Sequence, residues 1–314
     1  MENNKPFIHP YIALIIGVIT ISASAIMIKV TEAPSGVVAT YRMLFTVLLM
    51  TPLIMASYRH ELKKITKQDW IYSIVSGFFL ALHFVTWFES LNYTSVASSV
   101  VLVTLQPLFT FVGGYFFFQE RVNWKGVFGS ILAIVGSTII CWGDLRIGGM
   151  AIWGNILALL GAAFVSGYWL FGQSIRQRLS LMTYTYVVYG ASTVFLLLYV
   201  FMAQEALFPY PTKEWILFIS LAIFPTLLGH SIFNWALKWF SASMISMAIL
   251  LEPIGAAILA YFILGEVVTW TQGLGGFIIL LGIGIFVRQY EKNEQKQKEM
   301  LDMKQEDPSP GMNV

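Results

Sequence analysis

The chain has 314 residues, of which 57% are apolar and 11% are charged, and its mean hydropathy is +0.71. A soluble protein carries charge at about a quarter of its positions, so this composition excludes an ordinary soluble fold. A net charge of +2 suggests no nucleic-acid partner. The single cysteine, Cys141, excludes an internal disulfide, and no Cys/His spacing predicts a metal site. The composition instead indicates a protein embedded in a lipid bilayer.

Ten apolar segments follow one another along the chain, each with roughly the 20-residue length of a membrane-crossing helix. A membrane β-barrel would instead show stretches of about ten residues with alternating hydrophobicity. The predicted helices lie near residues 11–30, 35–57, 69–91, 94–119, 123–142, 150–172, 182–204, 213–235, 240–265 and 269–289. Segment 1–10 and the tail 290–314 are predicted to be cytoplasmic. The tail is charged and then contains Pro and Gly, which predicts disorder.

The basic residues predict the topology, because cytoplasmic loops of membrane proteins are enriched in Lys and Arg. With the N-terminus inside, fifteen of the nineteen Lys and Arg residues fall on the inner side and three on the outer side, while Arg42 lies within a helix. An even number of crossings gives this bias, whereas an odd number would scramble it. We therefore expect a multi-pass protein of the cell membrane with both termini in the cytoplasm.

The second half of the chain repeats the first half. A shift of 146 positions aligns identical residues of several chemical types without a gap: Ser95 with Ser241, Pro107 with Pro253, Glu120 with Glu266, Trp124 with Trp270, Gly129 with Gly275 and Gly136 with Gly282. A weaker match near a shift of 144 pairs Ser22 with Ser166. The repeats, residues 11–142 and 150–289, each have five predicted helices. Because five is odd, the second copy must enter from the opposite side, as in transporters that work by alternating access.

Two segments carry a family resemblance: Gln106-Pro107 through Gln119-Glu120, and Leu251-Glu252-Pro253 through Gly265-Glu266. Paired repeats that contain a helix-internal proline and end in an acidic residue resemble the EamA type of the drug/metabolite transporter superfamily. The resemblance covers about residues 10–290. It implies ten helices, cytoplasmic termini and a central cavity lined by both halves. Members mostly export amino acids and related metabolites, and some carry drugs, vitamins or sugar derivatives.

Ionisable side chains within a membrane are costly, so they are candidates for function. Glu252 lies about 18 Å into the ninth predicted helix, close to the midplane. Its repeat partner is the neutral Gln106. A carboxyl group at this depth suits binding of a proton or of a substrate amine. The alternative is a buried Glu that only fixes the bend at Pro253.

Three other ionisable groups are candidates for the same site. His83 and His230 lie one position from equivalence in the third and eighth helices, and Trp87 and Asn234 follow them by one turn. Histidine exchanges protons near neutral pH, but each ring could also make only an interhelical hydrogen bond. Arg42 could attract a substrate carboxylate, extend to the interface or pair with Glu32. Lys29 and Glu89 lie near helix ends and are weaker candidates.

Aromatic, hydroxyl and glycine patterns add to the predicted site. Trp87, Trp169, Trp235 and Tyr168 could form an aromatic cavity wall or mark membrane interfaces. A polar stripe of Ser95, Ser99, Gln106 and Thr110 could line the cavity or join helices. The glycine pairs at seven-residue spacing, Gly129/Gly136 and Gly275/Gly282, permit close helix contact. The resemblance implies homodimers through such helices, and packing within one chain is the alternative.

The sequence has no Walker loop, nucleophile elbow or HExxH motif, so we expect neither an enzyme nor a cofactor. Without a nucleotide site, uphill transport must use an ion gradient. We therefore predict a secondary active transporter that exports amino acids or related small metabolites in exchange for protons. The alternative is an importer or facilitator of a vitamin, nucleoside or sugar derivative, or a drug efflux protein.

Overall fold

The computed structural model describes residue 6 and residues 8–140, 149–264 and 269–306. All regular elements within these residues are helical, and they form ten apolar crossings, of which nine have the full length expected for a membrane span. This confirms the predicted all-α polytopic fold. In chain order the crossings are α1–α2 (Pro10–Ser22 and Ser24–Lys29), α3–η1–α4 (Ser35–Leu53, Ile54–Tyr58 and Arg59–Leu62), α5 (Lys67–Tyr93), α6–α7 (Val96–Val103 and Gln106–Phe118), α8 (Trp124–Ile140), α9 (Ala151–Ile175), α10 (Leu181–Met202), α11–η3–α12 (Thr212–Leu221, Ala222–His230 and Ser231–Ala236), α13–α14 (Ala242–Ile249 and Glu252–Leu264) and α15 (Trp270–Glu306).

The fourth and ninth crossings are broken halfway, where the sequence predicted continuous helices. α7 and α14 begin at Gln106 and Glu252, and a proline follows each of these residues. Proline has no N–H group for the helical ladder, and its ring clashes with the carbonyl group four residues earlier. The chain therefore tightens at each break: Leu105 N donates to Leu102 O at 3.2 Å, and Leu251 N donates to Ala248 O at 3.0 Å.

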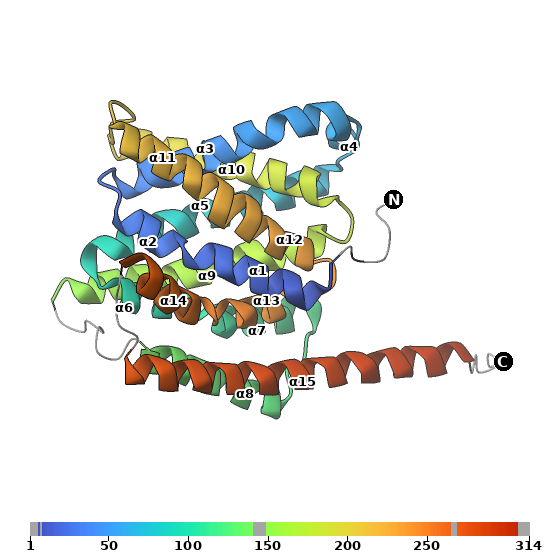
Figure 1. Ribbon diagram of the computed structural model, residues 1–314. Helices are drawn as coiled ribbons and strands as arrows, with labels where there is room; N and C mark the ends of the chain where they lie inside the picture. The colour runs from blue at the N-terminus through green and yellow to red at the C-terminus, as the bar shows by residue number, and fades with distance from the viewer. Residues whose placement is uncertain (1–5, 7, 141–148, 265–268, 307–314) are drawn as a thin grey trace.

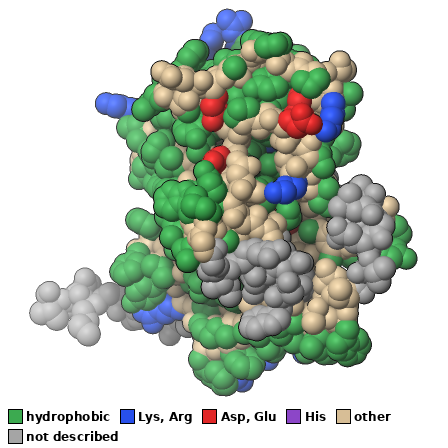
Figure 2. Space-filling view, turned by 90° about the vertical axis from the view of Figure 1, so that its left-hand side faces the viewer, with side chains coloured by type: hydrophobic (Ala, Val, Ile, Leu, Met, Phe, Trp, Pro, Cys, Tyr) green, Lys and Arg blue, Asp and Glu red, His purple; other side chains and the backbone are tan. Residues whose placement is uncertain are grey.

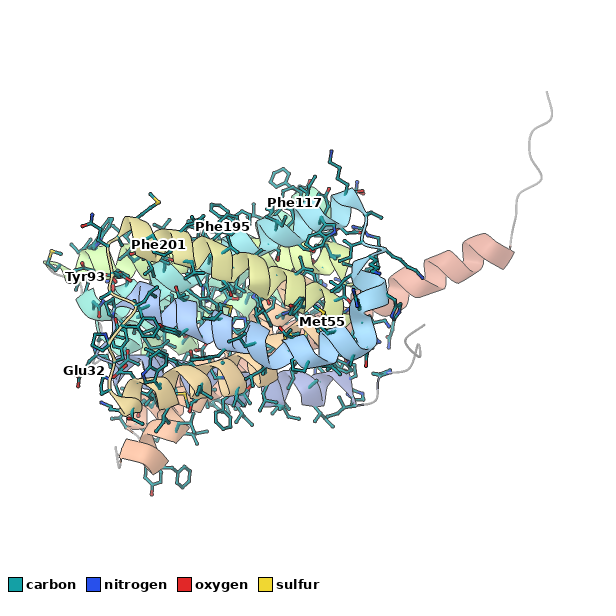
Figure 3. The ribbon with its side chains drawn as sticks, turned by 90° about the horizontal axis from the view of Figure 1, so that it is seen from above. Glu32, Met55, Tyr93, Phe117, Phe195 and Phe201 are labelled. Carbon is teal, nitrogen blue, oxygen red and sulfur yellow. The ribbon has the colours of Figure 1, made fainter. Side chains whose placement is uncertain are left out.

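The two broken crossings run in opposite directions. In Figure 1, α6 leads into α7 toward the end of the bundle that carries both termini, whereas α13 leads into α14 away from it. We call that end the terminal end and the other the opposite end. This arrangement confirms two inverted repeats. Glu32 and Tyr93 lie at the opposite end in Figure 3, and Figure 2 shows acidic and basic side chains there among apolar ones.

α8 and α15 pack along each other as a separate layer on one side of the bundle (Figure 1). Glycine permits this approach: a Cβ atom at Gly129 would lie 2.7 Å from Gly282 O, and one at Gly136 would lie 2.7 Å from Gly275 O. The repeated glycines therefore join helices within one chain, as one of the two interpretations expected. Their role in a homodimer stays a prediction.

The predicted disorder of the tail 290–314 is wrong for its first part, because α15 continues to Glu306 and projects beyond the bundle (Figure 3). The physical reason is local composition. Residues 291–306 are mostly Glu, Lys, Gln, Met and Leu, which have high helix propensity, and Pro and Gly come only afterwards. Residues 307–314 lie outside the described residues.

Candidate functional site

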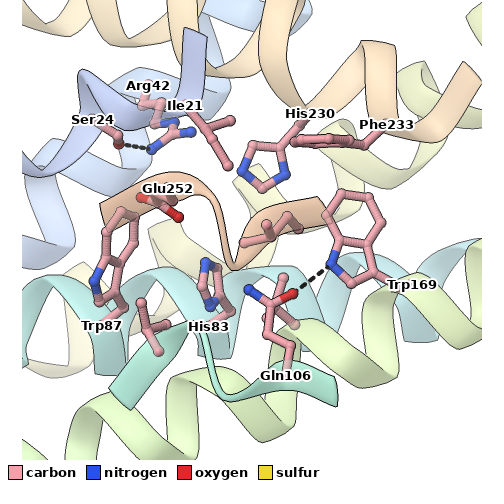
Figure 4. Close-up of a pocket in the computed structure, with 13 residues that line it drawn as sticks. Ile21, Ser24, Arg42, His83, Trp87, Gln106, Trp169, His230, Phe233 and Glu252 are labelled. Atoms are coloured by element: carbon pink, nitrogen blue, oxygen red, sulfur yellow. Dashed lines mark hydrogen bonds between the residues drawn. The ribbon is translucent and has the colours of Figure 1, made fainter. Parts of the chain in front are cut away.

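Residues beside both helix breaks line a narrow cavity of about 30 Å³ in the middle of the bundle (Figure 4). A buried water needs roughly 10–15 Å³ by this measure, so the cavity has room for about two water molecules. A metabolite would fit only after the surrounding helices move apart. The structure therefore shows the site in a contracted form.

Arg42 of α3 reaches this cavity and is fully buried. Its Nε donates to Thr226 Oγ1 at 2.7 Å, and its Nη1 donates to Ser24 Oγ at 3.0 Å. The guanidinium carbon lies 4.4 Å from the centre of the Phe84 ring, a cation–π distance. Nη2 has no hydrogen-bond partner among the described residues. An unpaired buried donor costs about 1–3 kcal/mol, so Nη2 is available to bind an anionic group.

Glu252 is the first residue of α14 and faces Arg42 across the cavity (Figure 4). Only 4% of its surface is exposed. Within the described part of the chain its carboxyl group has no hydrogen-bond partner, and the ion pairs there join other residues. The amino end of a helix carries partial positive charge, which favours an acidic side chain at this position. The cavity thus holds a guanidinium group and a carboxyl group that are not hydrogen-bonded to each other.

The two helix breaks are held by equivalent hydrogen bonds from opposite repeats. Ser22 Oγ donates to the backbone O of Glu252, and Ser166 Oγ donates to the backbone O of Gln106, both at 3.3 Å. Trp169 Nε1 also donates to Gln106 Oε1 at 3.0 Å, which fixes that amide. The scaffold is therefore nearly symmetric, whereas the charge on the Glu252 side has no counterpart on the Gln106 side.

His83 and His230 both line the cavity, from α5 and from the end of η3. His83 Nδ1 lies 2.9 Å from Gly161 O. A carbonyl oxygen only accepts, so Nδ1 carries the hydrogen and Nε2 is the basic nitrogen. His230 Nδ1 is buried and has no partner among the described residues. η3 is π-helical and contains Pro225. Such segments are frequent at functional sites.

Aromatic rings form two walls of the cavity. The ring of His230 stacks on Trp169 with centroids 5.6 Å apart, and His83 stacks on Trp87 at 5.5 Å. Trp87 Nε1 is buried without a partner in the described chain. The cavity therefore offers flat apolar surfaces.

Seven of the ten predicted site residues line the cavity: Glu252, His83, His230, Arg42, Gln106, Trp87 and Trp169. The structure places the other three elsewhere. Ser99 lies 2.6 Å from Ser90 Oγ in a hydroxyl pair, and Asn234 donates its amide to Tyr168 OH one turn beyond His230. These three side chains contact one another or their neighbours in the packed interior.

The alternative partner for Arg42 was wrong, because Glu32 lies 3.9 Å from Lys213 Nζ on the surface. Trp235 packs on Trp239 at 4.2 Å and lines a separate groove, so it is not part of the cavity wall. In the polar stripe only Gln106 reaches the cavity. Lys29 donates to Leu91 O at 2.9 Å, and Glu89 accepts from Asn92 at 3.2 Å.

Sequence reasoning missed six residues that line the cavity, five of them apolar: Ile21, Ser24, Val103, Val165, Phe233 and Ile249. Ser24 could have been found, because it lies in the small-residue stretch Ser22-Ala23-Ser24-Ala25 of an otherwise bulky helix. The described residues contain no group of three or more His, Cys, Asp or Glu that could hold a metal ion. The site's chemistry is that of binding: an anion donor, a carboxyl group, two imidazoles and aromatic faces.

Comparisons with known proteins agree with this architecture. The transporter YxxF of Bacillus subtilis (strain 168), which is named as uncharacterized, is 25% identical over 296 residues, covering 94% of each chain. An uncharacterized transporter of Synechocystis, sll1164, is 28% identical over 238 residues, covering 71% of this chain and 67% of the relative. A solved crystal structure shares the fold with a TM-score of 0.72 at 14% identity, covering 88% of this chain and 95% of that one.

The sequence model of the EamA-like transporter family matches the chain twice, over residues 9–142 and 152–288. Each match covers one five-helix repeat, and together they take in both helix breaks and every residue that lines the cavity. The chain therefore belongs to the EamA-like transporter family.

Proposed function

We propose that this protein is a secondary active transporter that exports amino acids or related small metabolites in exchange for protons. Its family and its inverted repeats support alternating access to the central cavity. The observation that carries the proposal is the pair Arg42 and Glu252: a buried guanidinium group and a buried carboxyl group that face each other without an ion pair.

A zwitterion complements this pair. Its carboxylate would bind Arg42 Nη2, and its ammonium group would bind the Glu252 carboxylate. Each group would gain a charge-assisted hydrogen bond in a site shielded from water. The side chain of the substrate would lie against the Trp87 and Trp169 walls. A small ligand with separated charges fits better than a purely apolar one, because Arg42 and Glu252 would otherwise stay unpaired.

Proton exchange follows from the single carboxyl group. Glu252 can hold a proton or a substrate ammonium group but not both, so release of one permits binding of the other. Its neutral repeat partner, Gln106, cannot do this. His83 and His230 line the same cavity as Glu252, and an imidazole can take up and release a proton.

Separate observations support the membrane location, the transport chemistry and a second candidate ligand. The distribution of Lys and Arg supports a cell-membrane protein with both termini in the cytoplasm. Transport without any enzymatic step agrees with relatives named as transporters. The stacked pair Trp169–His230 favours a second candidate, a planar ligand such as a vitamin, nucleoside or drug. The direction of flux in a strain lacking the gene separates export from import.

The test begins with a thermal-shift screen of the purified protein against amino acids, nucleosides and cationic drugs, because a ligand that binds the folded state stabilises it. The stabilising amino acid is then loaded into proteoliposomes, and its efflux is measured with and without a pH gradient. Glu252→Gln should abolish the pH dependence. Arg42→Gln should weaken binding by roughly 10- to 150-fold, the equivalent of one charge-assisted hydrogen bond of about 1.5–3 kcal/mol.

Glu89→Gln is the matched control, because Glu89 lies outside the cavity and accepts from Asn92. It should leave both binding and pH dependence unchanged. Unchanged pH-dependent efflux in Glu252→Gln would remove Glu252 from the mechanism. Stabilisation by nucleosides or cationic drugs alone would favour the second candidate.

A further inference from the structure

Buried polar side chains continue from the central cavity toward the terminal end. They come from α5, α9, α10 and α12, and we call them the seam: Ser73, Ser76, Tyr168, Tyr184, Ser192 and Asn234. Asn234 Nδ2 donates to Tyr168 OH, Ser76 Oγ donates to Tyr168 O at 3.3 Å, and Ser76 Oγ lies 2.9 Å from Tyr184 OH. All six are 0% exposed, so the seam is closed in this structure.

The seam residues lie between the cavity and the terminal ends of α5 and α10. α5 and α10 both begin at the terminal end (Figure 1). At 1.5 Å per residue, Tyr184 lies about 5 Å from the start of α10 and Ser192 about 17 Å, while Ser73 and the cavity residue His83 lie about 9 Å and 24 Å along α5. Polar groups therefore occur at every depth between the surface and the site.

Three polar atoms of the seam have no hydrogen-bond partner among the described residues: Ser73 Oγ, Ser192 Oγ and Asn234 Oδ1. An unpaired buried polar group is unfavourable, and water in an open passage would satisfy it. The hydroxyl groups between the broken helices differ in this respect. Thr110 and Ser246 lie 2.7 Å apart and bond to each other, so that contact needs no water.

The seam is closed by backbone contact and by an ion pair. A Cβ atom at Gly77 of α5 would lie 2.6 Å from Val188 O of α10, so the two helices touch there. Nearer the surface, Arg178 Nη2 lies 2.6 Å from Asp69 Oδ1 and joins the start of α5 to the α9–α10 connection. Separation of α5 from α10 would break both contacts and expose the unpaired hydroxyl groups.

We propose that the seam is the terminal-side passage through which substrate and water reach the central cavity, and that it opens when α5 and α10 separate. The inference rests on the alternating access proposed above, but it does not depend on the substrate class. It assigns a role to the buried hydroxyl groups of Ser73 and Ser192, which make no hydrogen bond within the described residues.

The test uses single cysteines in a Cys141→Ala background, since Cys141 is the one native cysteine. Ser73→Cys and Ser192→Cys are near-isosteric and lose no hydrogen bond, because neither hydroxyl has a partner in the described structure. Ser137→Cys is the matched control: its hydroxyl is equally buried and unpaired there, but it lies in α8. A membrane-impermeant thiol reagent is applied to each face of membrane vesicles.

Both seam cysteines should react from the terminal face, and Ser137→Cys should not. Asp69→Asn weakens a partly exposed ion pair worth up to about 1 kcal/mol, so it should speed the reaction by up to about fivefold. Equal reaction of Ser137→Cys, or no reaction of either seam cysteine in the Asp69→Asn background, would overturn the passage.

Thermal stabilisation of the same variants by amino acids separates the two proposals. If an amino acid stabilises them but the seam cysteines stay unreactive, the passage is wrong and the proposed function stands. If the cysteines react but no amino acid stabilises the protein, the passage stands and the proposed substrate class is wrong.

Discussion

Gly282 of α15 gives the sharpest prediction about the packing of the α8–α15 layer. A Cβ atom there would lie 2.5 Å from both Gly129 O and Ala133 N of α8. These are backbone atoms, so no side-chain rotation relieves the contact. The two helices would have to separate by about 1 Å to restore normal carbon contacts, which forfeits dispersion energy along their length. Overpacking of this kind costs about 1–3 kcal/mol.

Gly284 is the matched control on the same helix, because a Cβ atom there meets nothing within 4 Å. Gly284→Ala should stabilise the helix by up to about 1 kcal/mol through helix propensity. Both variants gain the same helix propensity, so we expect Gly282→Ala to be less stable than Gly284→Ala by the overpacking cost, about 1–3 kcal/mol, measured as the free energy of unfolding in mixed detergent micelles. Equal stabilities of the two variants would refute the close backbone contact between α8 and α15.

Two further predictions concern the ends of the bundle. Ser180 caps α10 and donates to the Glu61 carboxylate at 2.5 Å, so Ser180→Ala should lower the free energy of unfolding by about 1–2 kcal/mol, and an unchanged denaturation midpoint would contradict this. Burial and the neighbouring Glu89 carboxylate raise the pKa of Glu205 above its usual value. The folded protein therefore holds this proton more tightly than the unfolded chain does. The contribution of Glu205 to the free energy of unfolding thus increases as the pH falls through the raised pKa toward the usual pKa. Glu205→Gln should remove that part of the pH dependence in thermal unfolding, and an identical pH profile would argue against it.

Much of the fold could be predicted, because lipid imposes a strict pattern on the sequence. Apolar length predicts each crossing, and matched residues such as Pro107 and Pro253 reveal the repeat. The helix breaks were not predicted, since a proline in an apolar run is equally compatible with a kinked helix. The break at Glu252 depends on a contact from the other repeat, the hydrogen bond from Ser22, which lies 230 residues away in sequence.

The polar part of the site could also be predicted, and the apolar part could not. Arg42, His83 and Glu252 stand out because ionisable groups are rare in membrane helices. Val103 and Ile249 look the same in sequence whether they face a cavity or lipid. Asn234 was assigned to the cavity from its spacing after His230, but its side chain donates to Tyr168 OH instead of lining the cavity.

The central claim is that one cavity becomes accessible from the two faces of the membrane in turn. Val103 lines this cavity and is 2% exposed, so Val103→Cys in the Cys141→Ala background reports on it directly. The measurement is the rate of reaction with an impermeant thiol reagent added to each face of sealed vesicles. The account predicts reaction from both faces, slowed on both by a bound amino acid. Reaction from one face only, or from neither, would contradict it.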